Sequence, residues 1–264
     1  MTIGFGVAGA LDHAIVAELA RAAEKAKFSS FWANDTPNGD GLAALAAAQR
    51  QTSSIRLGVG VIPVDRKPAT DIAAQIEHLD LDPARLIVGI GSGGLTVGAI
   101  DSVRANALEL RRVTPATVVV GALGPRMCDV GGEAADGVLL NWLTPAQFEG
   151  SAAQVRAVAA AAGRSAPYVG AYVRVALDGP AAERVGEEAA RYEGYPAYAA
   201  HFARMGVRAF ETCVVGTRYQ IADGLRAYSK SAGEVIVRAI AAEETLDAYL
   251  ALMVAAAPTG IKSE

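Results

Sequence analysis

The chain of 264 residues is rich in apolar residues, at 52 %, and poor in aromatic ones, at 6 %. Its net charge of −4 and the lack of a basic stripe argue against a nucleic-acid partner, and no apolar run approaches the ~20 residues that span a bilayer. Cys128 and Cys213 match no metal-ligand spacing and are interpreted as reduced thiols. Because no basic region precedes an apolar one at the N-terminus, we expect a cytoplasmic protein without membrane contact.

Short β-branched runs alternate with alanine-rich helical stretches along the chain. Several runs, such as Val118-Val119-Val120, are almost continuously apolar, which is typical of parallel strands covered on both faces. The eight predicted strands are Ile3–Val7, Ser30–Asn34, Ile55–Ile62, Leu86–Ile90, Ala116–Gly121, Gly137–Asn141, Tyr168–Val175 and Glu234–Ile240.

A helix is predicted after almost every strand, and Asp12 is expected to cap the first of them. The predicted helices are Asp12–Lys27, Gly41–Gln51, Ala69–Asp80, Gly98–Leu110, Pro125–Glu133, Pro145–Ala162 and Ala181–Arg191. Two more helices, divided by a turn near Gly216, are expected between Tyr195 and Tyr228, and Glu243–Ala256 forms the last helix.

Strict alternation of strands and helices builds a parallel sheet, and eight repeats in about 250 residues are typical of a closed barrel. We therefore predict an α/β protein with a (β/α)8 TIM barrel, in which residues 1–257 form a single domain. Residues 258–264 are expected to form a flexible tail. A doubly wound open sheet is the competing architecture.

In such a barrel the chemistry lies where strands end and helices begin. Asn34, Asp35 and Thr36 follow the second predicted strand and could bind the edge of a polar ring, although turn hydrogen bonds explain them equally well. Gly60, near the end of the third strand, has no Cβ, so a flat ligand could approach the backbone there. Relief of crowding inside the barrel is the alternative reason for this glycine.

A glycine-rich loop follows the fourth predicted strand. The run from Gly89 to Gly94 matches the dinucleotide-binding fingerprint literally. We do not assign that role, because the run lies on the fourth strand and no acidic residue ends the next one. The loop could instead offer backbone N–H groups to an anion or a sugar hydroxyl, or it could be a tight turn. The residues concerned are Gly91, Ser92, Gly93 and Gly94.

Two later strand ends predict a phosphate site. The segment after the fifth strand consists of Gly121, Ala122, Leu123 and Gly124. It precedes Pro125, which suits the first position of a helix whose free N–H groups and dipole attract phosphate. Asn141 and Thr144, after the sixth strand, could reach a phosphate or a ribityl chain, while Thr144 could equally be a helix cap before Pro145.

Three stretches resemble a known family. They are Ser54–Pro63 with Arg66 and Pro68, then Leu79-Asp80 with Pro83–Gly93, and finally Gly124–Met127 with Gly132–Trp142. Together they resemble the bacterial luciferase-like monooxygenase superfamily, and the last stretch resembles the branch that uses the deazaflavin coenzyme F420. The resemblance extends from Ile3 to about Thr144 and weakens toward the C-terminal helix.

This resemblance implies a barrel, usually homodimeric, that binds F420 or alternatively FMN at the carboxyl ends of its strands. It implies a cis peptide bond between Gly60 and Val61 behind the ring, with Asp35 beside the ring. It also implies that Gly91, Ser92, Gly93 and the segment Gly121–Gly124 contact the ribityl chain and the phosphate. The candidates for binding the acidic tail of F420 are Arg66, Lys67 and Arg126.

The sequence departs from the family pattern at three places. Thr36 stands where relatives that use sugar phosphates often have histidine, and Gly94 stands where they can have glutamate. The segment from Gly94 to Ala116, between the fourth and fifth strands, is shorter than is usual in the family. We therefore expect an open site or one that a partner subunit completes.

These observations predict an F420-dependent oxidoreductase that transfers a hydride between the cofactor and a small organic substrate. Asp35 and Thr36 are the candidate catalytic residues. An FMN-dependent monooxygenase that uses reduced flavin and oxygen is the alternative of the same class, and a non-catalytic flavin- or F420-binding protein is the alternative of another class. An aldolase-type barrel is disfavoured because no predicted strand contains lysine. We expect no metal site, since the histidines have no ligand spacing: His13, His78 and His201.

Overall fold

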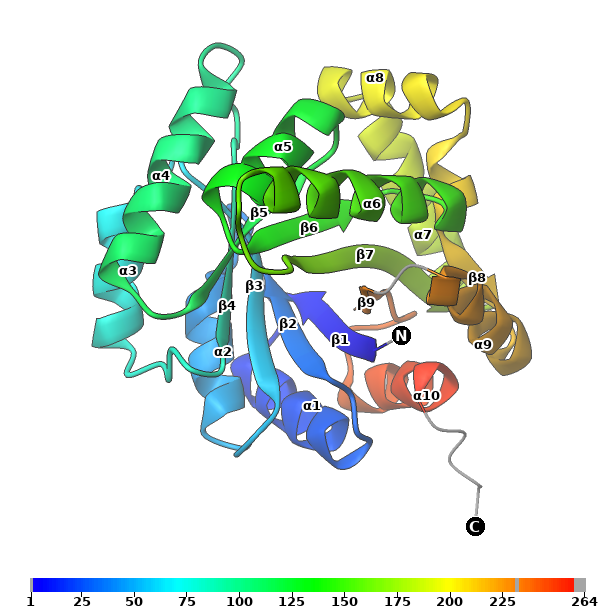
Figure 1. Cartoon of the computed structure of the whole chain (residues 1–264). Helices are drawn as coiled ribbons and strands as arrows, with labels where there is room; N and C mark the ends of the chain where they lie inside the picture. The colour runs from blue at the N-terminus through cyan, green and yellow to red at the C-terminus, as the bar shows by residue number, and fades with distance from the viewer. Residues whose placement is uncertain (1, 231–232, 259–264) are drawn as a thin grey trace.

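The computed structural model describes residues 2–230 and 233–258. In this part of the chain, eight parallel strands close into a barrel, because the last strand pairs with both the first and the seventh (Figure 1). The strands of the barrel are β1 (Thr2–Ala8), β2 (Ser30–Asn34), β3 (Arg56–Pro63), β4 (Leu86–Gly91), β5 (Thr117–Ala122), β6 (Gly137–Asn141), β7 (Tyr168–Leu177) and β9 (Glu234–Ala239). The predicted (β/α)8 barrel is confirmed, and the open sheet is excluded.

Helices surround the barrel, as Figure 1 shows. Their bounds are α1 (His13–Lys25), α2 (Gly41–Gln49), α3 (Ala69–His78), α4 (Ala99–Val113), α5 (Pro125–Ala134), α6 (Pro145–Ala161), α7 (Pro180–Glu193), α8 (Pro196–Met205), α9 (Arg218–Arg226) and α10 (Leu246–Ala256), with short 3-10 helices at Ala209–Thr212 and Ala227–Lys230. The side chain of Asp12 accepts hydrogen bonds from the backbone N–H groups of Ala14, at 2.7 Å, and Ile15, at 3.4 Å. The prediction that Asp12 caps the first helix is therefore confirmed.

The structure corrects the prediction in the segment before the last strand. Where only a turn near Gly216 was expected, a short strand β8 (Val214–Gly216) pairs with Val175–Leu177 at the end of β7. β7 continues past the stretch that pairs with β9, and β8 pairs with this continuation. β8 therefore lies outside the closed barrel. Three residues are too few for a periodicity signal. Of the predicted tail, the segment 259–264 lies outside the described residues.

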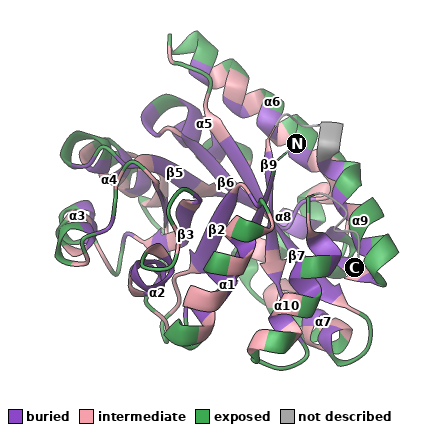
Figure 2. Ribbon diagram, turned by 90° about the horizontal axis from the view of Figure 1, so that it is seen from below, coloured by how far each residue is buried: buried purple, intermediate pink, exposed green. Residues whose placement is uncertain are grey.

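The strands are buried, and the helices around them present both buried and exposed residues (Figure 2), so the two main parts of the core lie on the two faces of the sheet. One part fills the space between the sheet and the helices. The other fills the barrel itself and consists of Trp32, Ile87, Val119, Leu139, Tyr172 and Ile236. Side chains alternate between the two faces of a strand. The residues two positions before and after each of these six therefore also point into the barrel. No helix of the described residues has the length and apolar character to cross a bilayer.

Candidate functional site at the carboxyl ends of the strands

The carboxyl ends of the strands meet at one end of the barrel, which we call the mouth. Side chains along a strand point alternately inward and outward, so a residue two positions beyond an interior core residue also points inward. At the mouth these inward positions hold polar and small residues. The residues that define the mouth are Asn34, Val61, Gly121, Asn141, Arg174 and Arg238. They come from six different strands, so only closure of the barrel brings them together.

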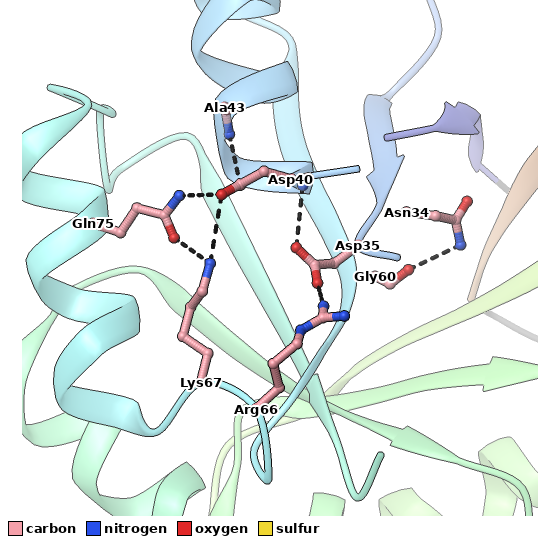
Figure 3. Close-up of polar contacts among 9 residues, drawn as sticks. Asn34, Asp35, Asp40, Ala43, Gly60, Arg66, Lys67 and Gln75 are labelled. Carbon is pink, nitrogen blue, oxygen red and sulfur yellow. Dashed lines mark hydrogen bonds and ion pairs between the residues drawn. The ribbon is translucent and has the colours of Figure 1, made fainter. Parts of the chain in front are cut away.

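The loop after β2 contains Asp35, whose side chain is almost fully buried at 2 % exposure. Its Oδ2 atom accepts a hydrogen bond from the backbone N–H of Gly41 at 3.1 Å, and its Oδ1 atom forms an ion pair with Arg66 (Figure 3). Thr36 lies in a tight turn and forms two backbone hydrogen bonds with Gly39. Both residues therefore organise this loop, and their catalytic role stays a prediction.

Asp40, in the same loop, holds the start of α2 against α3. It accepts hydrogen bonds from the backbone N–H of Ala43 at 3.0 Å and from Gln75 at 2.6 Å, and Lys67 Nζ lies 3.6 Å away (Figure 3). Burial opposes ionisation of Asp40, but these hydrogen bonds and the Lys67 charge lower its pKa. Arg66 and Lys67, predicted for an acidic cofactor tail, are thus already paired within the protein.

The peptide bond between Gly60 and Val61 is cis, as predicted. The Asn34 amide donates a hydrogen bond to the Gly60 carbonyl at 2.9 Å. A Cβ atom on Gly60 would lie 2.5 Å from Leu139 and 2.9 Å from the Tyr172 hydroxyl, so only glycine fits here. Gly60 therefore lies directly against the filled interior of the barrel.

The side chain of Val61 explains why β4 and β5 each have a glycine beside it. A Cβ atom at Gly91 would lie 2.8 Å from a methyl group of Val61, and one at Gly121 would lie 2.9 Å from the other. Such separations are closer than carbon atoms tolerate. Both glycines thus make room for a side chain of the protein itself, and their predicted contact with a cofactor is not needed to explain them.

The glycine-rich loop after β4 contacts a carboxylate of the loop after β3, that of Asp65. Asp65 accepts a hydrogen bond from the backbone N–H of Gly94 at 2.8 Å, and a Cβ atom on Gly93 would overlap the same carboxylate. Gly93 also has a φ of +60°, which favours glycine. The negative charge of Asp65 makes Gly93 and Gly94 poor partners for an anion, while Ser92 is half-buried in the same loop.

The loop after β5 is covered by a basic residue that the sequence analysis did not identify. Arg204, on α8, donates a hydrogen bond to the Leu123 carbonyl at 2.7 Å and lies 2.6 Å from Nδ1 of His201. His201 is buried, and its Nε2 atom lies 2.9 Å from the Trp142 carbonyl. Because arginine only donates, Nδ1 accepts and Nε2 carries the proton. Burial, with the charge of Arg204, lowers the pKa of His201 and keeps it neutral.

Arg204 therefore places a positive charge beside the start of α5, where Pro125 is at the first turn and the preceding Gly124 has no side-chain cap. A helix N-terminus and a guanidinium group both attract anions. Thr144 occupies the N-cap position of α6 but makes no capping hydrogen bond, so its hydroxyl is not needed for that role. These two loops remain the best candidates for the predicted phosphate contacts.

One wall of the mouth is formed by the neighbouring ends of β7 and β9. It is built around Arg174, which is only 4 % exposed. Its Nη1 atom donates to Asn141, its Nε atom lies 3.1 Å from Glu188 of α7, and its guanidinium stacks on the ring of Trp142 at 3.6 Å. Arg238 on β9 stands directly opposite Arg174 in the strand register. The sequence signal for both arginines was a charge at an inward position of an otherwise apolar strand.

Two polar atoms near Gly60 have no hydrogen-bond partner among the described residues. They are Oδ1 of Asn34 and the hydroxyl of Tyr172, and both are buried. Burial raises the pKa of Tyr172 well above its usual value, so the hydroxyl stays protonated. Since buried polar atoms almost always have a partner, a bound group or a water molecule is expected beside them. No cluster of three potential metal ligands occurs in the described part of the chain.

Comparisons with known proteins agree with this architecture. The family model for luciferase-like monooxygenases matches residues 6–102 and 98–234. A 5,10-methylenetetrahydromethanopterin reductase from Methanolobus tindarius is 28 % identical over 205 residues, which are 64 % of this chain and 63 % of that enzyme. The chain thus aligns with less than two thirds of that relative.

Two solved structures share the fold at low sequence identity. An F420-dependent secondary alcohol dehydrogenase in complex with an F420-acetone adduct superposes with a TM-score of 0.76, at 14 % identity, over 97 % of this chain and 98 % of that one. An EDTA monooxygenase from Chelativorans sp. BNC1 superposes with a TM-score of 0.73, at 13 % identity, over 98 % of this chain and 92 % of that one.

Proposed function

The chain belongs to the luciferase-like monooxygenase family, and from that premise we propose that it is an oxidoreductase that binds coenzyme F420 at the mouth. It would transfer a hydride between the deazaflavin and a small organic substrate. Support comes from the reductase of Methanolobus tindarius, at 28 % identity, and from the fold shared with an F420-dependent dehydrogenase.

The observation that carries the proposal is the pair of unpaired atoms around Gly60. Tyr172 offers a hydrogen-bond donor and Asn34 Oδ1 offers an acceptor. The pyrimidine edge of a deazaflavin or a flavin contains both carbonyl and N–H groups, so it complements such a pair. Gly60 without its Cβ and the side chain of Val61 provide a small apolar surface beside them. The part of the mouth around Gly60 therefore fits a flat ring with a polar edge.

Each part of the mouth would have its own task. The bound deazaflavin would supply the carbon that donates or accepts the hydride. Asn34, fixed by its bond to the Gly60 carbonyl, would orient the ring edge. Arg204 and the start of α5 would bind the phosphate. Tyr172, kept protonated by burial, would donate a hydrogen bond without exchanging its proton.

The experiment is a titration of the purified protein with F420, followed by quenching of the cofactor fluorescence. We expect Asn34→Ala to raise the Kd about tenfold, which is the loss of roughly 1.4 kcal/mol. Asn38→Ala is the matched control, since Asn38 is exposed in the same loop. A wild-type protein that fails to quench F420 at tens of micromolar would contradict the proposal.

An FMN-dependent monooxygenase is the second candidate function. It is supported by the shared fold with an EDTA monooxygenase, at a TM-score of 0.73. The two cofactors share the ring, the ribityl chain and the phosphate, but only F420 carries an acidic tail. With Arg66 and Lys67 paired internally, the exposed Arg126 is the remaining predicted contact for that tail. Tighter binding of FMN than of F420, unaffected by Arg126→Gln, would favour the flavin enzyme.

Turnover distinguishes both enzymes from a non-catalytic binding protein. F420-bound protein should reduce or oxidise at least one member of a panel of small alcohols, ketones and organic acids, followed by the absorbance of the cofactor. Binding of F420 without turnover of any compound in the panel would support a non-catalytic binding protein.

A further inference from the structure

The structure points to an anionic substrate. Resting on the function proposed above, we propose that the substrate carries an oxyanion group, either a carboxylate or a phosphate ester, and that Arg238 binds this group at the mouth. Arg238 would then determine specificity, separately from the residues that bind the cofactor.

Arg238 points into the barrel. It lies on β9 two residues after Ile236, which belongs to the interior core with Trp32, and four residues after Glu234, which hydrogen-bonds to Ser30 inside the barrel at 2.8 Å. Alternation along the strand therefore directs its side chain inward at the carboxyl end. In the parallel register it stands opposite Arg174 of β7. Two guanidinium groups thus occupy neighbouring positions of one wall.

The two arginines differ in their partners. Arg174 is engaged within the protein, because its Nη1 atom donates to Asn141, its Nε atom donates to Glu188, and the Trp142 ring covers one of its faces. Arg238 is half-buried, and the bond described for it runs from Nη1 to the carbonyl of Ala239 at 2.7 Å. No ion pair within 4.0 Å joins Arg238 to a carboxylate of the described residues. Its guanidinium therefore has donors left for a ligand.

The charges at this wall do not balance. Glu188 supplies one negative charge against the two positive charges of Arg174 and Arg238. Burial opposes ionisation of Glu188, but the attraction of both arginines lowers its pKa, so it stays ionised and counts fully in this balance. Holding a half-buried cation without a counter-charge costs free energy. An oxyanion that accepts two parallel hydrogen bonds from the guanidinium group is the best partner for it.

A substrate oxyanion at Arg238 would also lie close to the proposed cofactor site. Burial raises the pKa of Tyr172, while the positive charges of Arg238 and Arg174 act on the same phenol in the opposite direction. The hydroxyl of Tyr172 in turn lies beside Gly60. One end of the substrate would therefore be fixed near the ring, which is the requirement for placing a reacting carbon over it.

The test compares a carboxylate with its neutral amide of the same shape, and a phosphate ester with both. Propionate, propionamide and methyl phosphate are titrated into the F420 complex, and also into the protein without cofactor, with binding followed by ligand-observed NMR. We expect propionate to bind about tenfold more tightly than propionamide. Whether propionate or methyl phosphate binds more tightly identifies the type of oxyanion. The inference would be overturned if propionate bound no more tightly than propionamide and methyl phosphate did not bind either.

The variant Arg238→Gln should abolish the preference for propionate while the Kd for F420 changes by less than about twofold. Arg112→Gln is the control, since Arg112 is 70 % exposed on α4. The variant Glu188→Gln should act in the opposite direction and tighten propionate binding, because it removes the negative charge that attracts both arginines. A preference that survives in Arg238→Gln would contradict the inference and leave the proposed function intact. Failure of the wild type to bind F420 would instead contradict the proposed function.

Discussion

The two ends of the barrel interior are built from the same strands but differ in how their polar groups are satisfied. At the amino end, Glu234 of β9 accepts hydrogen bonds from Tyr168 of β7 and from the hydroxyls of Ser29 and Ser30. Ser30 in turn accepts one from the Trp32 indole at 2.7 Å. All these groups have partners within the protein. Nothing at this end requires a ligand.

At the carboxyl end the corresponding residues of the same two strands are Tyr172 and Arg238. The hydroxyl of Tyr172 has no partner among the described residues, and no ion pair within 4.0 Å joins Arg238 to a carboxylate of those residues. Each end therefore has a tyrosine of β7 and a charged residue of β9, but only at the amino end does the tyrosine hydrogen-bond to that charged residue in the described structure. The difference teaches that the amino end serves stability, while the unpaired groups at the mouth are where a bound molecule or a water molecule is expected.

The largest effect is expected at the closed end. Glu234→Ala should lower the free energy of unfolding by about 3 kcal/mol, because it leaves three hydroxyl donors unpaired in a buried place. The measurement is urea denaturation followed by tryptophan fluorescence. Glu234→Gln, which keeps an acceptor oxygen, is the control and should lose less. A loss below about 1 kcal/mol for the alanine variant would remove the stabilising role assigned to this end.

A matched pair of substitutions on β7 tests the comparison most directly. Tyr168→Phe removes a hydrogen bond to a charged acceptor and should cost about 2 kcal/mol of stability. Tyr172→Phe removes a hydroxyl that has no partner, so stability should change by less than about 0.5 kcal/mol. The same variant should weaken F420 binding several-fold, whereas Tyr168→Phe should leave the cofactor affinity unchanged. Equal losses of stability in the two variants would show that the ends do not differ.

The architecture was predictable because its signals are local. Alternation of apolar runs and helical periodicity depends only on neighbouring residues, and it placed all strands of the barrel to within two residues at each end. The exception is β8, which is held by pairing with the end of β7 rather than by a pattern of its own. The strand ends followed from the fold, so Asn34, Gly60 and Asn141 were identified as residues of the site region.

The contacts within the site were not predictable, because they join residues that are far apart in sequence. Arg204 reaches Leu123 across 81 positions, and Arg174 reaches Asn141 across 33. Glycine is ambiguous for a different reason. A missing Cβ can admit a ligand or a neighbouring side chain, and the sequence is the same in both cases. At Gly91 and Gly121 the neighbour is Val61, as only the packed barrel reveals.

The smallest effect concerns a second carboxylate at the amino end. Glu24 of α1 accepts hydrogen bonds from the backbone N–H groups of Ser53 at 3.0 Å, Ser54 at 2.7 Å and Ile55 at 2.8 Å, just before β3. Burial opposes its ionisation, but these bonds lower its pKa from 4.5 to about 2. Because the pKa is lower in the folded protein, the stabilisation is fully present above about pH 4.5 and is lost as the pH falls toward 2.

Glu24→Gln should therefore reduce stability at pH 7 by about 1 kcal/mol, and the difference from wild type should shrink steadily between pH 5 and pH 2. Urea denaturation at a series of pH values measures both quantities. Glu18→Gln is the control on the same helix, where the carboxylate pairs only with Arg21 at an exposed position. A difference that stays constant over this pH range would mean that the charge of Glu24 does not hold the loop.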